Sequence, residues 1–369
     1  LIQINNDIFT EEEREYLRVN RFWVDDNEDE IALLEREINH NIQKRQKELE
    51  LTIALTNYCN FSCVYCYQNK NEKLMTTEVA NMIIEKIDRI LNDNIFEGIN
   101  IHYFGGEPLL NIPVLIYLDE NIKKITDKIG IVYKAFLTTN GSMLSKELLQ
   151  KVKFSSIQLT FDGLEKTHDR LRVSDHFHFK EEIELIENIM NFSQAKVLLR
   201  TNICKENKDE IIALHKYIFE KFGNERIEIN PNRTIKYHQD DSFEMLSVQE
   251  YAEVAYQIKL LWSEQKGKFE LPVPRSTPCK FPYGNAYAIS PEGYCTFCSG
   301  SMDQEKKYFF DVDIENKKMF SVRKECKKCN ILPLCLGGCI IQYNLRAGAC
   351  TYEKYELKNI LISYIKHIS

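Results

Sequence analysis

Hydrophobic and polar positions between residues 51 and 235 predict strands that alternate with helices. Six apolar runs, rich in β-branched and aromatic residues, predict strands at 51–56, 99–104, 131–138, 156–161, 196–203 and 226–230. Each run precedes a stretch of helical spacing, as with Val79, Ile83 and Ile87. Six β–α units in series predict a parallel sheet covered by helices. Six are too few for a closed eight-stranded barrel, so we expect an open, TIM-like (βα)6 partial barrel with its active site at the carboxyl ends of the strands.

The first 50 residues follow a different pattern. Strand-like runs at 2–4 and 22–24 are followed by an acidic turn at 25–30. Apolar residues then recur at helical spacing over 31–42, which predicts a helix with one buried stripe. This stripe either packs on its own protein or docks a partner.

These patterns divide the chain into four parts. Residues 1–50 are an N-terminal prelude, and residues 51–235 are the partial barrel. Residues 236–278 are a bridging segment, with a helix that begins at Val248. Residues 279–369 hold most of the cysteines, and the cysteine-containing part is poor in periodic helices. We expect a small domain organised by metal rather than by an apolar core.

The composition is that of a globular protein, since 44% of the 369 residues are hydrophobic and 28% are charged. This excludes a disordered tail or a fibre. No apolar run approaches the roughly 18–20 residues of a membrane span, and no secretory signal pattern begins the chain. The net charge of −7, without a basic block, argues against nucleic acid as the main partner. We therefore expect a cytoplasmic protein without a membrane or nucleic-acid partner.

Twelve cysteines add chemistry to this fold. Eleven of them fall in two clusters, at 59–66 and 279–350, and Cys204 stands apart. Their share of the chain is far below the roughly 8–10% of disulfide scaffolds. In a reducing cytoplasm, thiols at such short spacings are metal ligands before they are disulfides.

The first cluster has CxxxCxxC spacing and follows the first predicted strand. Three thiolates on one short loop, Cys59, Cys63 and Cys66, suit three corners of a [4Fe–4S] cluster whose fourth iron stays open. The alternatives are a zinc site or a chance grouping. Zinc requires a fourth ligand, and none appears before His102.

This loop resembles the signature of the radical S-adenosylmethionine (SAM) enzymes, CxxxCx(aromatic)C, with Tyr65 at the aromatic position. The resemblance implies that the open iron binds the amino and carboxylate groups of SAM. It also implies that an electron from the cluster cleaves SAM to a 5′-deoxyadenosyl radical. An external one-electron reductant, a flavodoxin or a ferredoxin, is then a required partner.

Motifs at the ends of later strands agree with the same family. Gly-Gly-Glu-Pro at 105–108 ends the second strand, and its glycines permit close backbone approach to a ligand. Thr-Phe-Asp-Gly at 160–163 and His-Asp-Arg-Leu-Arg at 168–172 resemble the family's Ser-x-Asp-Gly and HDxxR motifs, with Thr in place of Ser. Alone, such motifs are more often turns or surface pairs. Together the resemblance implies SAM contacts from Tyr65, Gly106, Glu107, Asn140, Thr160, Asp162, Arg172 and Arg200.

The second cysteine cluster resembles the seven-cysteine motif of the SPASM domain, which binds two auxiliary [4Fe–4S] clusters in a radical SAM subfamily. The implied ligands of auxiliary cluster I are Cys279, Cys295, Cys298 and Cys339. Those of auxiliary cluster II are Cys326, Cys329, Cys335 and Cys350. The chain would thus hold three [4Fe–4S] clusters. A pair of zinc ribbons is the alternative for this region.

Cys295 departs from the family pattern, in which an extra ligand of cluster I often follows the first cysteine more closely. If Cys295 does not bind, cluster I has an open iron able to bind substrate. No catalytic side chain is assigned from the sequence. Cys204 is either a packed small hydrophobe or a hydrogen-atom donor. We interpret His102, His168 and His215 as structural.

SPASM-containing relatives mostly act on peptides or proteins, so the resemblance implies a radical SAM oxidoreductase with such a substrate. We expect a peptide maturase that takes hydrogen from a residue of a ribosomal peptide and closes a C–C, C–O or thioether crosslink. The auxiliary clusters would accept an electron. Residues 1–50 suit this role, because sulfatase maturases begin almost at the cluster loop. They are, however, fewer than a complete leader-recognition domain contains.

Three alternatives stay open. A formylglycine-generating sulfatase maturase would tend to have an acidic base beside an auxiliary cysteine. Here Cys298 is followed by Ser299 and Gly300, with Asp303 further along. A peptide epimerase would use Cys204 as its hydrogen donor. A metal-binding scaffold without activity is the alternative of a different class.

Overall fold

A computed structural model describes most of the chain. The described residues are 10–19, 28–68, 70–93, 96–223, 226–236, 243–267, 269, 271–296, 298–301, 307–312, 319–339 and 350–368. The strands predicted at 2–4 and 22–24, and the first half of the acidic turn, lie outside these ranges. No helix within them is both long and apolar enough to cross a bilayer.

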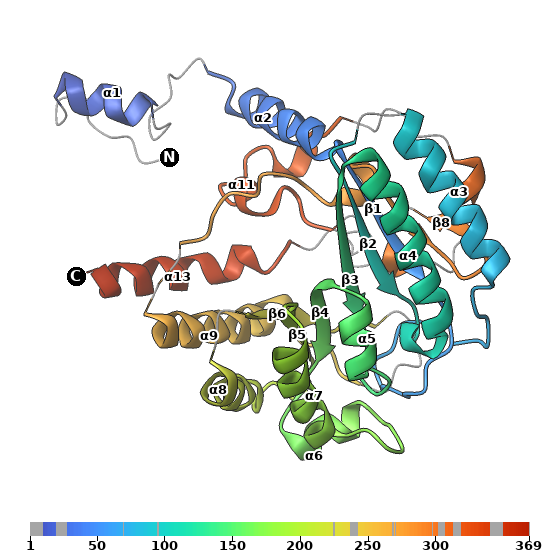
Figure 1. Ribbon diagram of the computed structural model, residues 1–369. Helices are drawn as coiled ribbons and strands as arrows, with labels where there is room; N and C mark the ends of the chain where they lie inside the picture. The colour runs from blue at the N-terminus through green and yellow to red at the C-terminus, as the bar shows by residue number, and fades with distance from the viewer. Residues whose placement is uncertain are drawn as a thin grey trace.

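A parallel sheet forms the centre of the molecule (Figure 1). Its six barrel strands lie in the order β6-β5-β4-β3-β2-β1, all parallel. They are β1 (Glu48–Ala54), β2 (Gly98–Phe104), β3 (Val132–Thr138), β4 (Phe154–Thr160), β5 (Lys196–Ile203) and β6 (Ile227–Arg233). The predicted open α/β sheet is confirmed, and β6 is its free edge. Every predicted strand lies within three residues of the observed one.

The C-terminal region extends the same sheet beyond β1. Strand β7 (Ala286–Ile289) pairs with β1 in parallel, and β8 (Tyr294–Thr296) and β9 (Lys307–Tyr308) follow in antiparallel order. The apolar pattern did not predict these strands, because each has only two to four residues. The start of the cysteine-rich region is therefore continuous with the barrel sheet.

Helices cover the barrel sheet with their apolar stripes. Helix α3 (Thr77–Asp93) buries Ile83, Ile87 and Ile90, as its spacing predicts. The other helices up to residue 267 are η2 (Pro108–Asn111), α4 (Ile112–Ile129), α5 (Lys146–Lys151), α6 (Glu165–Leu171), α7 (Phe179–Phe192), α8 (Ile211–Phe222) and α9 (Val248–Lys266). Helix α9 starts at a capping box formed by Ser247 and Glu250 and ends at the left-handed Gly267.

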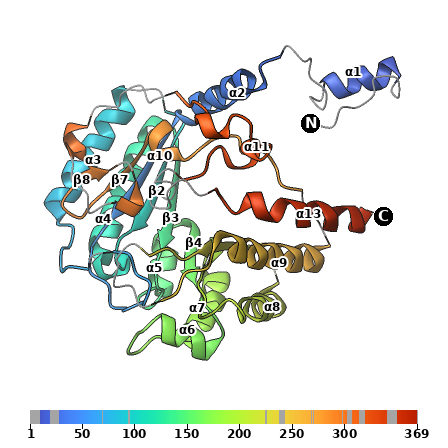
Figure 2. The same ribbon diagram turned by 180° about the vertical axis from the view of Figure 1, so that it is seen from behind.

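The predicted helix at 31–42 is confirmed as α2 (Glu30–Arg45), and it packs on the cysteine-rich region. Ile38 and Ile42 share a small apolar cluster with Phe320, Val322 and Leu336. The stripe of α2 thus packs on its own protein. Helix α1 (Glu11–Val19) lies apart from the rest of the molecule in both ribbon views (Figures 1 and 2).

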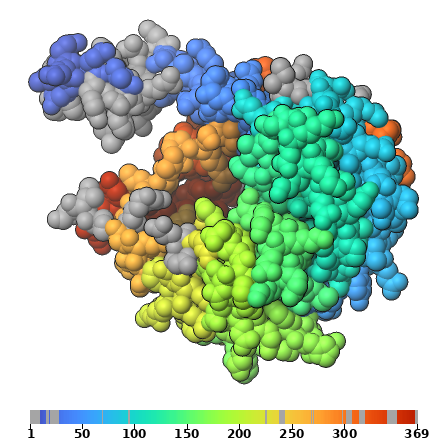
Figure 3. All heavy atoms as spheres, viewed as in Figure 1, coloured from blue at the N-terminus to red at the C-terminus, as the bar shows by residue number. Residues whose placement is uncertain are grey.

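The cysteine-rich region consists of short elements and one long helix. The short ones are α10 (Lys280–Tyr283), η3 (Ser299–Ser301), η4 (Phe309–Asp311), η5 (Lys324–Cys326) and α11 (Leu332–Cys335). Helix α13 (Glu353–Ile368) packs against α9, where Lys259 pairs with Glu356. The space-filling view shows a hollow between the orange and red C-terminal region and the yellow-green part of the barrel (Figure 3).

An ion-paired carboxylate joins the prelude, the barrel and the cysteine-rich region. Glu50 on β1 accepts from Arg45 Nε at 2.9 Å and from Lys280 Nζ at 2.7 Å. Burial alone would raise the pKa of Glu50, but the charges of Lys280 and Arg45 outweigh burial and hold that pKa below its usual value. The carboxylate therefore stays charged and links α2, β1 and α10.

Glu50→Gln should lower the free energy of unfolding by about 1–3 kcal/mol at pH 7, because it removes a buried carboxylate between two cations. Since the folded pKa is lowered, the cost should shrink as the pH falls through that pKa and wild-type Glu50 becomes protonated. Denaturant unfolding of the purified protein measures it. Glu97→Gln is the control, because its pair with Lys47 is exposed and should be worth under about 1 kcal/mol. Equal costs for the two variants would contradict the view that Glu50 is a buried, charged link between Arg45 and Lys280.

Candidate functional site

The cysteine loop, residues 59–66, follows the carboxyl end of β1, and the β2 loop holds the chain that leads to it. Gly106 N donates to Thr56 O and Glu107 N donates to Tyr58 O, each at 2.8 Å. The chain before the first cysteine is therefore fixed by hydrogen bonds to the end of the neighbouring strand.

Glycine is required at 105 and 106 because two backbones touch there. A Cβ atom on Gly105 would lie 2.3 Å from Thr56 O, and one on Gly106 would lie 2.2 Å from Tyr58 O. Gly105 also has a φ of +132°, which favours glycine. The sequence predicts close approach to a ligand. In the structure, the neighbour that these glycines approach is the chain leading to the cysteines.

Glu107 is fully buried and joins the ends of β2 and β3. Its Oε1 accepts from Leu109 N at 3.0 Å and from Thr139 Oγ1 at 2.6 Å, and its Oε2 accepts from Asn140 N at 2.6 Å. Burial raises the pKa of Glu107, whereas these donors and the charge of Arg172 act against that rise. The carboxylate therefore fixes two strand ends around the cysteine loop.

Asn140 connects the end of β3 to the first cysteine. Its Nδ2 donates to Asn60 Oδ1 at 2.8 Å and lies 3.9 Å from Cys59 Sγ. Its Oδ1 accepts from the backbone and the hydroxyl of Ser142. The predicted site residue Asn140 thus contacts the cysteine loop directly.

Asp162 joins the cysteine loop to the ends of β4 and β5. One carboxylate oxygen accepts from the Tyr65 hydroxyl, and the other accepts from Asn202 N at 2.6 Å. Arg172 Nη1 lies 3.5 Å from the same Tyr65 hydroxyl. Tyr65, Asp162 and Arg172, which the sequence places on three separate motifs, therefore form one buried cluster under the cysteine loop.

Arg172 carries a buried donor that no described residue satisfies. The side chain is 6% exposed, and its Nε has no hydrogen-bond partner among the residues that the structure describes. Glu182 Oε2 lies 4.0 Å from Arg172 Nε and 3.1 Å from His168 Nε2, and it too has no hydrogen-bond partner among the described residues. The guanidinium also lies over the Phe61 ring, 5.3 Å from its centroid. A buried guanidinium with a free donor fits an anionic group such as a carboxylate.

Thr160 and Arg200 occupy paired positions at the ends of β4 and β5. Arg200 Nε donates to Asn202 Oδ1 at 2.9 Å, and burial lowers the pKa of Arg200. Seven of the eight predicted SAM residues therefore lie in the second half of a strand, just after a strand end or in the cysteine loop, whereas Arg172 lies at the carboxyl end of α6. The structure brings Glu107, Asn140 and Asp162 into one hydrogen-bonded frame around that loop.

The thiols of the cysteine loop are partly buried and lie near one another. Burial raises the pKa of Cys63 to about 11, with the charge of Arg172 acting against it and those of Cys66 and Cys59 adding to it. Phe61 N lies 3.4 Å from Cys59 Sγ, as expected for an amide that donates to a sulfur ligand.

No three His, Cys, Asp or Glu side chains in the described part of the chain converge as the ligands of a single ion do. In an iron–sulfur cluster each cysteine binds a different iron, so such ligands need not converge. The donor set of three thiols therefore fits a cluster with one iron free for another ligand.

Four cysteines of the C-terminal region line one cavity. Its volume is about 410 Å³, and its lining includes Cys326, Cys329, Cys335 and Cys350. Gly337 N lies 3.4 Å from Cys335 Sγ. These are the four residues that the sequence assigns to auxiliary cluster II, and four thiols around one cavity fit that group.

The cysteines assigned to auxiliary cluster I have different surroundings. Cys279 and Cys339 are exposed, and they lie close enough that a charge on Cys339 raises the pKa of Cys279. Cys298 is half-buried, and its sulfur lies 3.3 Å from Gly300 N. Cys295 is only 4% exposed and belongs to the main hydrophobic core. These surroundings fit the alternative in which three cysteines bind cluster I.

Cys204 is fully buried behind the cysteine loop. It packs with Leu171, Phe243, Val64 and Tyr65, and its thiol lies 3.6 Å from Asn207 Oδ1. Burial raises its pKa to about 12. These surroundings fit a packed small hydrophobe.

Two histidines lie largely out of solvent: His215 is buried and His102 is half-buried. Burial lowers the pKa values of His102 and His215 to about 4. His102 pairs with Thr138 Oγ1 at 2.8 Å, and His215 accepts from Trp262 Nε1 at 3.0 Å. Both therefore act as hydrogen-bonded structural groups at neutral pH.

A polar cavity of about 230 Å³ lies on the inner face of the sheet, beside α10. The polar residues that line it are Glu50, Asn100, His102, Thr138, Ser156, Gln158 and Lys280. Lys280 follows Cys279 in the cysteine-rich region, whereas the other polar residues of the lining lie on β1 to β4. The cavity therefore lies between the barrel and the cysteine-rich region.

Several residues of this frame were missed from the sequence. Asn60 and Asn207 act through hydrogen bonds near the strand ends, both to distant residues and, for Asn207, to its own loop, and no local pattern marks them. Glu182 had a signal: it is an acid on the buried stripe of α7, beside Phe179 and Ile183. A charge at a core position indicates a buried partner, and here those partners are His168 and Arg172.

Residues 53–218 of this chain match a family model that is described as the Radical SAM superfamily. These residues carry the cysteine loop and the strand ends that frame it. The matched segment is therefore a radical SAM domain, a class whose members bind a [4Fe–4S] cluster and SAM.

Two curated relatives show how far the similarity extends. The radical SAM cyclopropyl synthase TigE of Paramaledivibacter caminithermalis is 24% identical over 88% of this chain and 76% of its own length. The protein MJ0907 of Methanocaldococcus jannaschii is 34% identical over 31% of this chain. The alignment spans only 39% of the length of MJ0907.

Solved structures show the same fold at low sequence identity. Native anSMEcpe with bound AdoMet has a TM-score of 0.68 at 18% identity, covering 87% of this chain and all of that chain. Streptococcus suis SuiB bound to the precursor peptide SuiA has a TM-score of 0.59 at 17% identity, covering 93% and 86%. These two proteins share the radical SAM fold with this chain.

Gly106→Ala should strip iron from the cysteine loop, because the new Cβ would collide with Tyr58 O. Iron and sulfide analysis of the reconstituted protein should show the loss of iron from this loop, with any iron held by the C-terminal cysteines retained. Gly130→Ala is the matched control: it has a positive φ but open space around its Cβ position. That variant should cost about 1 kcal/mol of stability and keep all its iron. Full iron in Gly106→Ala would contradict the packing described here.

Proposed function

We propose that this protein is a radical SAM peptide maturase. The observation that carries the proposal is the framed cysteine loop at the strand ends, together with a second set of four cysteines that line one cavity. The first arrangement suits SAM cleavage, and the second suits an additional cluster that handles electrons. A maturase that oxidises its substrate needs both.

The cysteine loop would hold the first cluster through Cys59, Cys63 and Cys66, with SAM on its open iron. Arg172, with its free buried donor, would bind the SAM carboxylate. Glu107, Asn140 and Asp162 would keep the loop in place. We propose the remaining contacts with SAM for Tyr65, Gly106, Thr160 and Arg200, which surround the same strand ends.

The cysteine-rich region would hold two further [4Fe–4S] clusters. Cys279, Cys298 and Cys339 would bind cluster I, and one iron would stay open because Cys295, the fourth ligand expected from the sequence, lies in the hydrophobic core. The four cysteines that line the 410 Å³ cavity would bind cluster II. We retain the division into residues 1–50, 51–235, 236–278 and 279–369 as part of this proposal.

When bound, these groups would supply the 5′-deoxyadenosyl radical and an acceptor for the electron that the substrate loses. The chain itself would hold the substrate residue in the polar cavity beside α10. A reaction that removes hydrogen and closes a C–C, C–O or thioether crosslink fits this combination. We propose a cytoplasmic setting, with a flavodoxin or a ferredoxin as the external reductant.

The case for a peptide substrate rests on the relatives. TigE, similar over most of this chain, is named a radical SAM cyclopropyl synthase. SuiB has been solved with its precursor peptide SuiA, and anSMEcpe with the Cp18Cys peptide. The hollow between the barrel and the C-terminal region would give an extended chain access (Figure 3).

Two other reactions are outcomes of the same test. A sulfatase maturase would oxidise Cys or Ser to formylglycine; Asp303, its candidate acid, lies outside the described residues. An epimerase needs an accessible hydrogen donor, whereas Cys204 is fully buried. No specific observation in this structure favours either reaction over crosslinking.

Mass spectrometry of a candidate peptide encoded beside this protein tests the function. The peptide is incubated anaerobically with reconstituted protein, SAM and a strong reductant. Loss of two hydrogens without formylglycine indicates a crosslink or a desaturation, and resistance to proteolysis between the joined residues distinguishes the crosslink. Deuterium uptake without loss of hydrogen indicates epimerisation. Absence of 5′-deoxyadenosine from fully loaded protein would refute radical SAM activity.

Cys59→Ala should abolish SAM cleavage, measured as 5′-deoxyadenosine, because the loop would lose one of three cluster ligands. The iron of the C-terminal clusters should remain. Cys204→Ala is the matched control, since it removes a buried thiol outside the cluster sites and should keep both iron and activity. Loss of all iron in Cys59→Ala would contradict separate cluster sites.

Cys335→Ala should leave SAM cleavage within about threefold of wild type but stop formation of the oxidised peptide. The reason is that Cys335 lines the C-terminal cavity and not the strand-end site. 5′-Deoxyadenosine and oxidised peptide are measured in one assay, which reveals any 5′-deoxyadenosine that forms without oxidised peptide. Unimpaired peptide turnover would remove auxiliary cluster II from the mechanism.

A further inference from the structure

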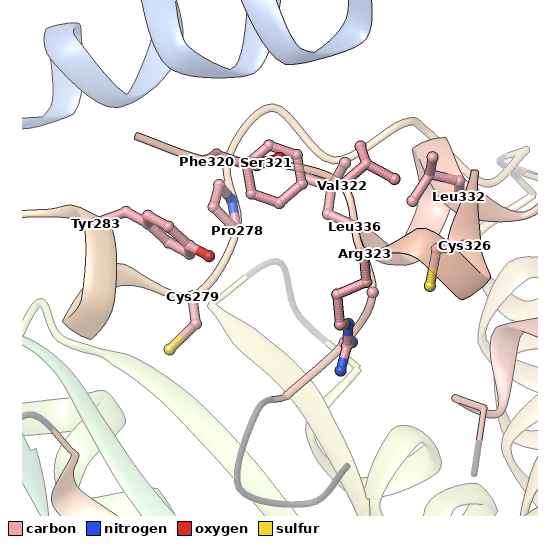
Figure 4. A pocket seen from close by; sticks show the side chains of 12 residues that line it. Pro278, Cys279, Tyr283, Phe320, Ser321, Val322, Arg323, Cys326, Leu332 and Leu336 are labelled. Atoms are coloured by element: carbon pink, nitrogen blue, oxygen red, sulfur yellow. The ribbon is translucent and has the colours of Figure 1, made fainter. Parts of the chain in front are cut away.

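Arg323 lies at the boundary between two cavities of the cysteine-rich region. The first has a volume of about 240 Å³, and its lining includes Cys279 and Cys326 (Figure 4). The second is the 410 Å³ cavity lined by the four cysteines of the proposed auxiliary cluster II. Arg323 lines both cavities, so it borders the proposed site of auxiliary cluster II and shares the first cavity with Cys279, an assigned ligand of cluster I.

The guanidinium points toward the thiol side of the first cavity. In Figure 4 the side chains of Cys279, Arg323 and Cys326 extend in the same general direction, with Arg323 between the two thiols in this view. Gly337 forms the wall behind it: a Cβ there would lie 2.6 Å from Arg323 Nη2. The guanidinium thus rests against the residue whose amide faces the Cys335 sulfur.

Helix α2 fixes the segment that presents Arg323. Asn39 makes two hydrogen bonds with the backbone of Phe320, at 2.9 and 2.7 Å, and Glu35 Oε1 accepts from Val322 N at 2.7 Å. Arg323 O in turn accepts from Cys326 N at 2.9 Å. The charge is therefore held on a backbone that is anchored on both sides.

Among the described residues, Arg323 is the charged residue that lines both cavities. Among the described residues that line the first cavity, it is the only Lys, Arg, Asp or Glu. Lys328, Lys354 and Glu325 line the second cavity only. Burial raises the pKa of Cys326; the charge of Arg323 acts against that rise, and the charge of Glu325 adds to it.

We propose that Arg323 is a redox-tuning residue whose fixed positive charge raises the reduction potentials of both auxiliary clusters. This inference rests on the proposed function, since it requires clusters at the two sites. A reduced cluster is one unit more negative than its oxidised form, so a nearby cation stabilises the reduced form more. Iron–sulfur potentials respond to such local charges.

The charge would help where the substrate is oxidised. When bound, SAM and the first cluster would supply a 5′-deoxyadenosyl radical, formed together with methionine as SAM accepts one electron, and this radical would take a hydrogen atom from the substrate. Closing the crosslink would then release one electron and one proton from the substrate radical. The electron would pass to an auxiliary cluster, and the proton would pass to solvent. Arg323 would make the auxiliary clusters better acceptors for that electron.

The test is an EPR-monitored redox titration of the reconstituted protein, with iron and sulfide analysis of each sample. Arg323→Gln removes the charge with similar length, and Arg323→Lys keeps the charge without the planar fork. Lys324→Gln is the matched control, because Lys324 is the next residue, exposed, and lines neither cavity.

Arg323→Gln should lower the midpoint potentials of both auxiliary clusters. Arg323→Lys should stay near wild type, Lys324→Gln should change little, and the SAM cluster should not shift in any variant. Unchanged auxiliary potentials in fully loaded Arg323→Gln would overturn the proposal. Loss of auxiliary iron from both Arg323 variants would also overturn it, because the role would then be structural. Wild-type protein with iron for one cluster only would instead refute the proposed function.

Discussion

Two buried carboxylates hold the cysteine loop at the ends of the barrel strands, and the candidate site depends on them. Glu107 ties β2 to β3, and Asp162 ties β4 to β5 while it accepts from the Tyr65 hydroxyl. A buried carboxylate is costly unless donors satisfy it. Each carboxylate has such donors only when the strand ends and the loop adopt this arrangement. The same bonds that stabilise the acids therefore fix the geometry of the three thiols.

The cysteine-rich region is joined to the barrel by polar contacts as well as by the shared sheet. Glu50 connects Arg45 and Lys280, and Asn39 holds the backbone of Phe320. Helix α2 contributes to both connections, so the prelude supports the surroundings of the auxiliary sites. This explains how a region of short elements keeps eight cysteines and Arg323 in place without a large core of its own.

Much of the fold could be predicted because its signals are local. Six apolar runs with helical stretches between them predicted the parallel sheet, and the apolar stripe over 31–42 predicted α2. The short strands β7 to β9 could not be predicted, since two to four residues carry too little periodicity. In the site, most predicted residues lie at strand ends, whereas the close contact of Gly105 and Gly106 with the chain that leads to the cysteine loop was seen only in the structure. Asn60 and Asn207 gave no signal, because their hydrogen bonds to strand ends leave no pattern in the sequence.

By itself, the sequence determined the chemistry available to this protein. Cysteine spacing is a local property, and so three thiols on one loop and a cysteine-rich C-terminal region could be recognised without coordinates. Only the tertiary structure decided which charges accompany the thiols. Arg172 lies against Tyr65, Cys295 lies in the core, and Arg323 borders two cavities, each through contacts between segments far apart in the chain. Such placements follow from packing and from the need to satisfy buried polar groups, which act across the whole fold.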